Sequence, residues 1–249
     1  MSYFFELHPD FTHFEKTLIN IKEHFKTNTE TIHKARNELK IIPLEGIKTV
    51  VKAFKIPHFL NQIVYKYFRS SKAKKSFQNA LKLQELGINT PTPIGYIEFY
   101  RWGLFQESFF LSKHLPYDFT IREVFHHKVD DVENILKQFS AFSYDLHQKG
   151  VWHVDYSLGN ILVQKKENSY EFYLVDINRM EFRESIPPQE GLKNFNKFWP
   201  KFPDDLPIIA KEYAKLSGFD EKEAIGIIID ENEKLQQQVA LKKKLKGKK

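Results

Sequence analysis

The sequence predicts an α+β protein of two lobes, in which a small antiparallel sheet precedes a mainly helical region. Three observations predict this class. Strand-like patterns dominate residues 31–112, a long amphipathic helix begins near residue 132, and the remaining periodicity is mostly helical. We therefore expect an N-terminal helix with a small lobe over residues 1–112, a helical lobe over 113–241 and a basic tail over 242–249.

The N-terminal helix is predicted by one apolar stripe, whose members recur at spacings of three and four residues: Phe11, Phe14, Leu18, Ile21 and Phe25. Strand-like stretches follow at Thr31–His33, Leu39–Pro43 and Ile47–Phe54, with a turn at Glu45-Gly46. These stretches predict a small antiparallel sheet.

A helix and a hairpin are predicted next. Ser70 and Ser71 offer an N-cap to a helix that runs to Leu86 and is stopped by Gly87. Two strands, joined around Arg101-Trp102-Gly103, are predicted after it: Ile94–Tyr100 and Leu104–Ser112.

The second lobe begins with a long helix, whose apolar positions run from Val132 to Leu146 and which ends at Gly150. A second hairpin follows an irregular loop, with strands predicted at Ile161–Gln164 and Glu171–Val175. The remainder is predicted to be helical, and Asp220 with Glu223 forms a capping pair before the last helix.

Composition excludes several classes of protein. The 249 residues are 41% hydrophobic, which is enough for a sizeable core. No cysteine is present, so disulfide frameworks, thiolate nucleophiles and cysteine-ligated zinc are excluded. The start lacks a basic region followed by an apolar stretch, and no run approaches the roughly 18 apolar residues that span a bilayer. We therefore expect a cytoplasmic protein that is neither secreted nor membrane-spanning.

The net charge of +6 comes from the end of the chain. Six of the 38 basic residues lie in the tail, and the other 32 balance the 32 acidic residues. Such a tail is either solvated and disordered or binds an anionic surface. A second asymmetry lies at residues 46–84, which hold nine basic residues and no acid. We expect this segment to face an anionic partner or solvent.

A loop after the long helix carries groups suited to metal and proton chemistry. It reads His153-Val154-Asp155-Tyr156-Ser157-Leu158-Gly159-Asn160, and the second strand of the next hairpin leads into Asp176. Because Asn160 enters this hairpin and Asp176 leaves it, we expect the two ends to lie side by side. An amide oxygen and a carboxylate suit Mg²⁺, and Asp155 is placed to accept a hydroxyl proton. The pattern indicates phosphoryl transfer, in which catalysis is mostly positioning and charge neutralisation.

The cation that should hold the phosphates is predicted at Lys52, in the strand-like run Thr49-Val50-Val51-Lys52. The patterns V-x-K and H-x-D-x-x-x-x-N and the hairpin leading to Asp176 occur in the order found in kinases, over about residues 30–180. The chain therefore resembles the bilobal protein-kinase-like fold, with a small antiparallel-sheet N-lobe and a mainly helical, shortened C-lobe.

Several features of protein kinases are absent. Val154 stands where an arginine precedes the catalytic aspartate, Ser157 stands where serine/threonine kinases keep a lysine, and Ile177-Asn178 replaces Phe-Gly. No A-P-E follows, and 73 residues remain after Asp176. We therefore expect no peptide platform, which favours the small-molecule branch of the fold that includes aminoglycoside and choline kinases.

Four strings are similar to the bacterial lipopolysaccharide kinase (Kdo/WaaP) family: Val51–Lys55, Leu86–Pro93, Leu146–Val151 and Asp176–Met180. The resemblance implies an ATP- and Mg²⁺-dependent kinase that phosphorylates a sugar hydroxyl, on Kdo or heptose, of the lipopolysaccharide inner core at the cytoplasmic membrane face. It also implies that Lys52 orients the ATP phosphates and that Asp155 is the base. In the same way, His153 braces the catalytic loop, and Asn160 and Asp176 hold Mg²⁺.

Two departures keep other functions open. The helix after Lys52 carries Ser76 or Gln78 at its expected inward turn, and its one acid, Glu85, lies near its end. Gly46 is the only glycine before Lys52, so a glycine-rich loop that cradles phosphate is not expected. The alternatives are a pseudokinase that binds a lipid or protein, and a soluble small-molecule kinase.

A basic and aromatic segment extends over residues 56–68, directly before Lys72, Lys74 and Lys75 of the next helix. Its aromatic residues either fill the core beside a solvated basic face or hold the enzyme at an anionic membrane surface close to its glycolipid acceptor. No nucleic-acid partner is expected.

Overall fold

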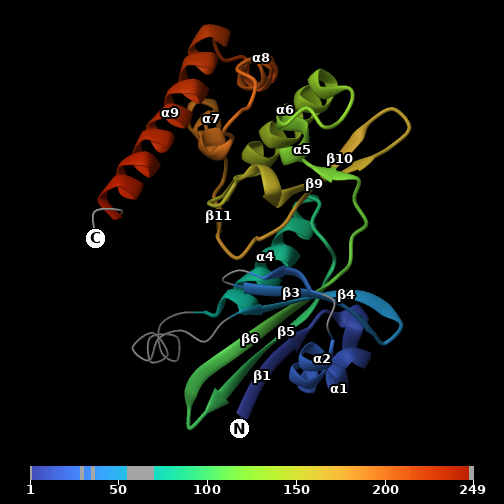
Figure 1. Cartoon of the computed structure of the whole chain (residues 1–249). Helices are drawn as coiled ribbons and strands as arrows, with labels where there is room; N and C mark the ends of the chain where they lie inside the picture. Colours follow the sequence, from blue (N-terminus) through green and yellow to red (C-terminus); the bar gives the residue numbers. More distant parts are fainter. Residues whose placement is uncertain (1, 29–30, 35–36, 55–69, 247–249) are drawn as a thin grey trace. The chain divides into compact units, whose positions relative to one another are not determined.

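The computed structural model describes residues 2–28, 31–34, 37–54 and 70–246 (Figure 1). The chain divides into two compact units. The N-terminal unit comprises Met1–Pro116 with Asp176–Asn178, and the C-terminal unit comprises Tyr117–Val175 with Arg179–Lys249.

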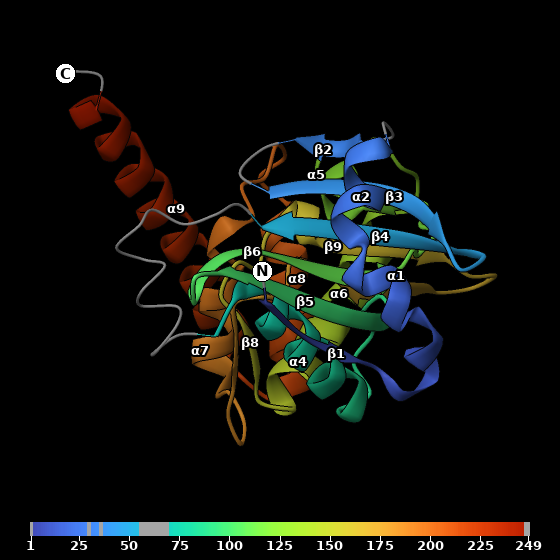
Figure 2. The ribbon, with the colours of Figure 1, turned by 90° about the horizontal axis from the view of Figure 1, so that it is seen from below.

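An antiparallel sheet forms the frame of the N-terminal unit, with six strands in the order β1-β5-β6-β4-β3-β2 (Figure 2). The strands are β1 (Ser2–Leu7), β2 (Thr31–Lys34), β3 (Asn37–Leu44), β4 (Ile47–Phe54), β5 (Pro93–Arg101) and β6 (Leu104–Lys113). The turns at Glu45-Gly46 and Trp102-Gly103 have positive φ at both residues, a geometry that joins twisted strands. Both predicted hairpins are confirmed, while β1 was not predicted.

The predicted N-terminal helix is wrong as a single element. The stripe is divided among η1 (Pro9–Phe14), α1 (Glu15–Ile19) and α2 (Ile21–Thr27), and Asn20 leaves helical geometry between the last two. Four apolar side chains of the stripe are nevertheless buried and Phe25 is partly buried, and they pack on one face of the sheet with Val51 and Ile97. The apolar spacing therefore predicted which residues face the sheet, but it did not predict where one helical element ends and the next begins.

The helix predicted from Ser71 is α4 (Lys72–Glu85), and its N-cap is confirmed because the Ser71 hydroxyl accepts a hydrogen bond from the backbone of Lys74. The ring of Phe77 on α4 lies 5.5 Å from that of Tyr96 on β5. Tyr96 and Ile97 are successive strand residues and point to opposite faces. The helix α4 and the pair α1 and α2 therefore cover opposite faces of the sheet (Figure 1).

The C-terminal unit is mainly helical. Its elements are β7 (Phe119–Thr120), α5 (Ile121–Phe125), α6 (Val132–Gln148), β8 (Val151–His153), η2 (Leu158–Asn160), β9 (Ile161–Lys165), β10 (Tyr170–Leu174), β11 (Met180–Phe182), α7 (Pro188–Lys193), η3 (Asn194–Lys197), α8 (Asp205–Ser217) and α9 (Glu221–Lys246). The long helix and the second hairpin are confirmed, and the Asp220 side chain caps α9 by accepting from the backbone of Glu223. The prediction that the remainder is helical misses β11, which pairs with β8.

An aromatic core joins α6 to the segment around η3. The buried ring of Phe139 lies 6.0 Å from Tyr156, 6.1 Å from Phe195 and 5.7 Å from Phe198. Each such pair adds about 0.5–1.5 kcal/mol beyond its buried area. The loop at residues 153–160 and η3 are thus packed on one rigid cluster.

Gly150 lies between α6 and β8 and has a φ of 70°. A Cβ atom at this position would lie 1.9 Å from the carbonyl oxygen of Arg183. Only glycine allows this close turn, which brings the chain directly into the loop at residues 153–160.

The structure tests only one of the predictions made for the two basic segments. The last helix continues to Lys246, so a disordered tail is wrong for Lys242–Lys246, of which Lys242–Lys244 are exposed on α9. The segment 56–68, with its predicted membrane contact, lies outside the described residues. Among the described residues, no helix is both long and apolar enough to span a membrane.

Candidate active site

Lys52 and Asp176 meet in the N-terminal unit, although 124 positions separate them. The Lys52 ammonium group donates a hydrogen bond to Oδ1 of Asp176. Lys52 lies in β4 and is mostly buried, with 12% of its side chain exposed. Its position follows from strand alternation, because Val51 points into the core on the other face. The acidic partner of Lys52 is thus the predicted metal ligand.

Asp176 is held in an uncommon backbone conformation, with a φ of 56°. Aspartate tolerates the left-handed region better than most residues. The amide of Asn178 donates to Oδ1 of Asp176 at 2.7 Å, and the buried Asn178 fixes the carboxylate from its own loop. The backbone conformation and the bond from Asn178 together fix the direction of the Asp176 carboxylate.

The helix α4 contributes an amide to the loop that carries Asp176. Asn79 donates to the carbonyl oxygen of Ile177 at 2.7 Å and so holds the loop that carries Asp176. Of the residues expected on the inward turn, Ser76 is buried and Gln78 is exposed. Glu85 pairs with Lys82 at 3.0 Å on the surface of the helix. The sequence analysis missed Asn79, because an isolated asparagine in a helix carries no distinctive pattern.

His153 lies at the start of the loop at residues 153–160, within the C-terminal unit. Its ring is fully buried, and Nδ1 accepts a hydrogen bond from the backbone of Asp155 at 3.1 Å. The proton of the neutral ring therefore lies on Nε2, which donates to the carbonyl oxygen of Val175 at 3.1 Å. His153 thereby connects the start of the loop to Val175, which lies between β10 and Asp176.

Asp155 carries the carboxylate of the loop, and two cations flank it. Lys197 Nζ lies 2.9 Å from Oδ1, and Arg179 Nη1 lies 3.1 Å from Oδ2. Partial burial alone would raise the pKa of Asp155, but the hydrogen bond from Lys197 and the charges of Lys197 and Arg179 outweigh it and lower this pKa below its ordinary value. Asp155 is therefore ionised at neutral pH and available to accept a proton.

Asn160 is fixed next to Asp155 on the same loop. Its amide nitrogen donates to the carbonyl oxygen of Asp155 at 2.9 Å, which leaves the side-chain oxygen as an acceptor. The carbonyl oxygen of Asn160 accepts from the backbone of Val175 at 2.9 Å. Asp176 is the next residue along the chain after Val175.

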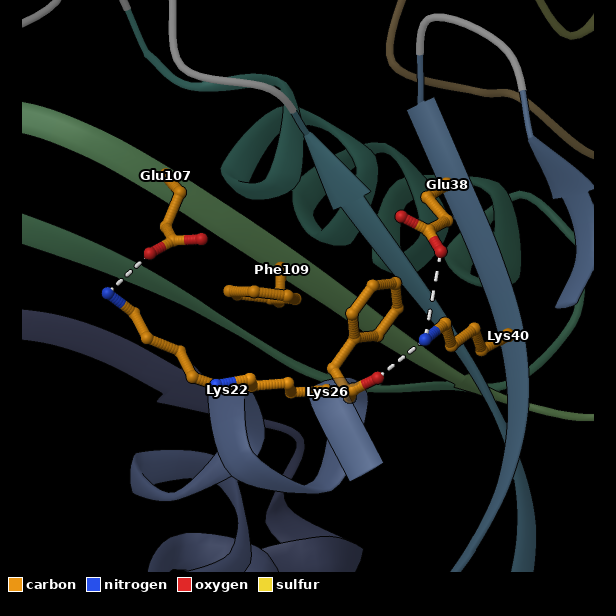
Figure 3. Close-up of a pocket in the computed structure, with 7 residues that line it drawn as sticks. Lys22, Lys26, Glu38, Lys40, Glu107 and Phe109 are labelled. Atoms are coloured by element: carbon orange, nitrogen blue, oxygen red, sulfur yellow. Dashed lines mark hydrogen bonds and ion pairs between the residues drawn. The ribbon is translucent and has the colours of Figure 1, made fainter. Parts of the chain in front are cut away.

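A separate cavity of about 430 Å³ lies beside α2, on the sheet face that is opposite to Lys52 (Figure 3). Its lining residues are Lys22, Phe25, Lys26, Glu38, Lys40, Glu107 and Phe109. Lys22 pairs with Glu107, and Lys40 donates to the carbonyl oxygens of Phe25 and Asn28. These cations are already engaged by protein oxygens, and the predicted site residues do not line this cavity.

Comparison with solved structures shows which fold the chain shares. The structure described as WaaP in complex with acyl carrier protein is 15% identical, with a TM-score of 0.62, and the alignment covers 94% of this chain and 98% of that one. The bifunctional kinase-methyltransferase WbdD is 16% identical with a TM-score of 0.46, covering 80% of this chain and 43% of that one. The likeness to WaaP confirms the predicted α+β fold.

Comparison of the sequence gives the family. No curated protein matches the sequence. The model of the lipopolysaccharide kinase (Kdo/WaaP) family matches residues 54–216, a range that contains His153, Asp155, Asn160 and Asp176 and begins just after Lys52. Because this match spans more than half of the sequence, the chain belongs to the lipopolysaccharide kinase (Kdo/WaaP) family, a family of phosphotransferases.

Proposed function

We propose that the protein transfers the γ-phosphoryl group of ATP to a sugar hydroxyl, on Kdo or heptose, of the lipopolysaccharide inner core at the cytoplasmic membrane face. The pairing of Lys52 with Asp176 is the main observation behind this proposal. It brings the predicted phosphate-binding lysine to the predicted metal ligand, although 124 positions separate them. Family membership gives the acceptor class. The ionised carboxylate of Asp155 supports a reaction at a hydroxyl group.

In the ion pair of Lys52 and Asp176, phosphate can replace the carboxylate as the partner of Lys52. An ammonium group that meets a carboxylate in the free protein can bind phosphate oxygens instead, because both partners are anionic oxygens. We assign Lys52 to the α- and β-phosphates. Asp176, released from Lys52, then has a carboxylate oxygen to offer a cation.

Asn160 and Asp176 fit a magnesium ion by the nature of their donor atoms. Mg²⁺ prefers a few protein oxygens and completes its shell with water and phosphate. Asn160 offers a side-chain oxygen, because its amide nitrogen is used by Asp155, and Asp176 offers a carboxylate. The bound ion would neutralise charge on the phosphates.

Asp155 is assigned as the base. The acceptor hydroxyl oxygen forms a bond to the γ-phosphorus, the bond to the β,γ-bridging oxygen breaks, and ADP leaves with that electron pair. The hydroxyl proton passes to the carboxylate of Asp155. His153 keeps this carboxylate in place through its bond to the Asp155 backbone.

Phosphate transfer to lipopolysaccharide tests the proposal. The purified enzyme would be incubated with Mg²⁺, ATP and lipopolysaccharide from a strain deleted for its gene, and the core sugars analysed by mass spectrometry. We expect one added phosphate on Kdo or heptose, and none with Asp155→Asn. An unchanged core, with phosphate passed instead to an aminoglycoside or choline, would favour a soluble small-molecule kinase.

We also propose that the enzyme binds an anionic membrane surface. Three aromatic residues are exposed on the edge strand β1 and in the turn between β5 and β6: Tyr3 is 47%, Phe4 53% and Trp102 86% exposed. Cations accompany them, since Lys74 lies 5.6 Å from the ring of Phe4 and Arg101 lies 4.4 Å from that of Trp102. Aromatic side chains beside cations are typical of residues at the membrane interface.

Sedimentation with anionic vesicles at low and high salt tests this attachment. Each basic residue near such a surface contributes about 1 kcal/mol, so replacing Lys72, Lys74 and Lys75 with Gln should weaken binding strongly at low salt. The control replaces three lysines of the C-terminal unit, namely Lys211, Lys215 and Lys222. Protein that stays in the supernatant at low salt would contradict the proposal.

A further inference from the structure

The carboxylate of Asp155 has a partner that no nearby sequence motif provides. Lys197 lies 42 positions further along the chain, at the end of η3, and its ammonium group donates to Oδ1 of Asp155 at 2.9 Å. The same ammonium donates to the carbonyl oxygen of Val154 at 2.7 Å. An ammonium group has three hydrogens to donate. Two of them hold the loop at residues 153–160, and none of the residues that the structure describes provides an acceptor for the third.

The segment that carries Lys197 is fixed on both sides. Phe195 and Phe198 are fully buried in the aromatic core. Asn232 on α9, itself 2% exposed, donates to the carbonyl oxygen of Phe195 at 2.8 Å. Asn194 donates to the carbonyl oxygen of His153 at 3.1 Å. The ammonium of Lys197 is therefore presented from a rigid segment that is bonded to three successive residues of the loop, His153, Val154 and Asp155.

The position of Lys197 agrees with a role at the phosphoryl group. An acceptor hydroxyl bound to Asp155 lies about 2.6–3.2 Å from the carboxylate, and its oxygen attacks phosphorus from about 3–3.5 Å. A cation on the same carboxylate lies close to the phosphoryl oxygens during transfer. Serine/threonine kinases place a lysine two residues after the catalytic aspartate, and Ser157 stands there in this chain.

We propose that Lys197 supplies the cation that neutralises the transferring phosphoryl group, in the place that Ser157 leaves open. This inference rests on the proposed function, because it assigns Asp155 to the base. Lys197 contributes charge at the moment when negative charge spreads over the phosphoryl oxygens. It takes no part in bond formation or proton transfer.

Arg179 is the competing cation, since it also contacts Asp155. Its side chain is 59% exposed, whereas that of Lys197 is 33% exposed and bonded to the backbone of the loop. A less exposed and better anchored cation acts more strongly on a developing charge, because water screens it less. We therefore expect Lys197, and not Arg179, to act on the transition state.

The test compares Lys197→Gln with Arg179→Gln and with Lys193→Gln, which removes an exposed positive charge one short turn away. Calorimetry would measure the binding of Mg²⁺ with ADP alone and of Mg²⁺ with ADP and aluminium fluoride, which imitates the transferring phosphoryl group. Transfer from ATP to the deletion-strain lipopolysaccharide would be measured in parallel. A fourth variant adds Ser157→Lys to Lys197→Gln.

For Lys197→Gln we expect affinity for the fluoride complex to fall on the order of 10²-fold, while affinity for ADP changes less than about threefold. The kcat should fall by a similar factor with little change in KM, and Ser157→Lys should restore at least about tenfold. Control values for Lys193→Gln should match the wild type. These results would establish a role that bracing alone cannot explain, because a brace is not restored from position 157.

Other outcomes overturn the inference. They are a Lys197→Gln protein that behaves like Lys193→Gln, a larger loss in Arg179→Gln, no recovery with Ser157→Lys, or a wild type that binds the fluoride complex no tighter than ADP. If Lys197→Gln does not fold, Lys197→Met replaces it, and failure of both variants to fold would assign Lys197 to structure. A wild type that binds the complex through Lys197 but leaves lipopolysaccharide unmodified would refute the proposed acceptor alone.

Discussion

Lys40 and Lys52 lie on neighbouring strands of one sheet and are both mostly buried, yet they meet different partners. Lys40 points to the face covered by α1 and α2, where its ammonium donates to the carbonyl oxygens of Phe25 and Asn28, both at 2.7 Å. Lys52 points to the opposite face and meets the carboxylate of Asp176. The carbonyl oxygens at the end of α2 cannot move away from Lys40 unless the helix unfolds. The side-chain carboxylate of Asp176 can release Lys52 and be replaced by another anion. We therefore propose that the partner, and not burial, separates the structural Lys40 from the functional Lys52.

Among the proposed site residues, we expect the largest loss of activity when Asp155 is replaced. Replacing Asp155 with Asn should lower phosphate transfer by about 10³–10⁴-fold, because the amide cannot accept the hydroxyl proton. The melting temperature should stay close to that of the wild type, because the carboxylate is partly exposed. Asp145→Asn, at an exposed acid on α6, should keep full activity. Equal activity of both variants would remove Asp155 from the chemistry.

The two lysines should lose different properties when replaced with methionine. Lys52→Met should lower the transfer rate by about 10²-fold with little change in stability, since it removes the proposed phosphate contact. Lys40→Met should lower the free energy of unfolding by about 1–3 kcal/mol, because two partly buried carbonyl oxygens lose a charged donor. Its activity per folded molecule should be kept. Urea unfolding and transfer rates measure both, and the reverse pattern would contradict the comparison.

The sequence predicted those parts of the fold that local chemistry determines. Glu45-Gly46 and Trp102-Gly103 form the expected turns, and Ser71 and Asp220 are the expected caps. The strand β1 was not predicted, because its residues are mostly exposed at the sheet edge and show no clear alternation. The break at Asn20 was also missed, since the apolar spacing continues across it.

The site was predictable only where its residues belong to a motif. His153, Asp155 and Asn160 lie on one loop, and the structure brings them together as expected. Lys197 and Asn79 reach their partners across 42 and 98 positions, and neither stands in a recognisable pattern. The acidic partner of Lys52 was sought on α4 and lies instead on the loop at Asp176. Such contacts depend on tertiary packing, which a single sequence does not reveal.

His147 in the C-terminal unit is buried and neutral, unlike the two mostly buried lysines, which are charged. Burial lowers the pKa of His147 to about 4, and its ring contacts Tyr213 and Asn194. In the unfolded chain His147 has a pKa near 6.5. The stability that its buried neutral ring contributes is therefore fully present above that pH and is lost as the pH falls toward 4. We expect a loss of about 2 kcal/mol between pH 7 and pH 5 from this residue.

Urea unfolding at both pH values measures this loss. His147→Gln should be less stable at pH 7, because the fit to Tyr213 and Asn194 changes, and should show a smaller loss on acidification. An equal loss in the variant and the wild type would show that other groups cause the pH dependence.

The smallest effect is expected at Glu85, the acid on α4 that does not meet Lys52. Glu85 pairs with Lys82 at the surface, and such pairs contribute about 0–1 kcal/mol. Glu85→Gln should therefore leave both the affinity for ATP and the unfolding midpoint nearly unchanged. A loss of ATP affinity equal to that of Lys52→Met would show that Glu85, and not Asp176, is the working partner of Lys52.

Nucleotide titration tests most directly the proposed exchange, in which Lys52 leaves Asp176 and binds phosphate. A non-hydrolysable ATP analogue with Mg²⁺ would be titrated calorimetrically into the wild type, Lys40→Met and Lys52→Met, each shown to be folded. We predict that the wild type and Lys40→Met bind with similar affinity and that Lys52→Met binds at least about tenfold more weakly. A wild type that binds no nucleotide would instead support the pseudokinase alternative, and equal binding by both variants would contradict the assignment of Lys52.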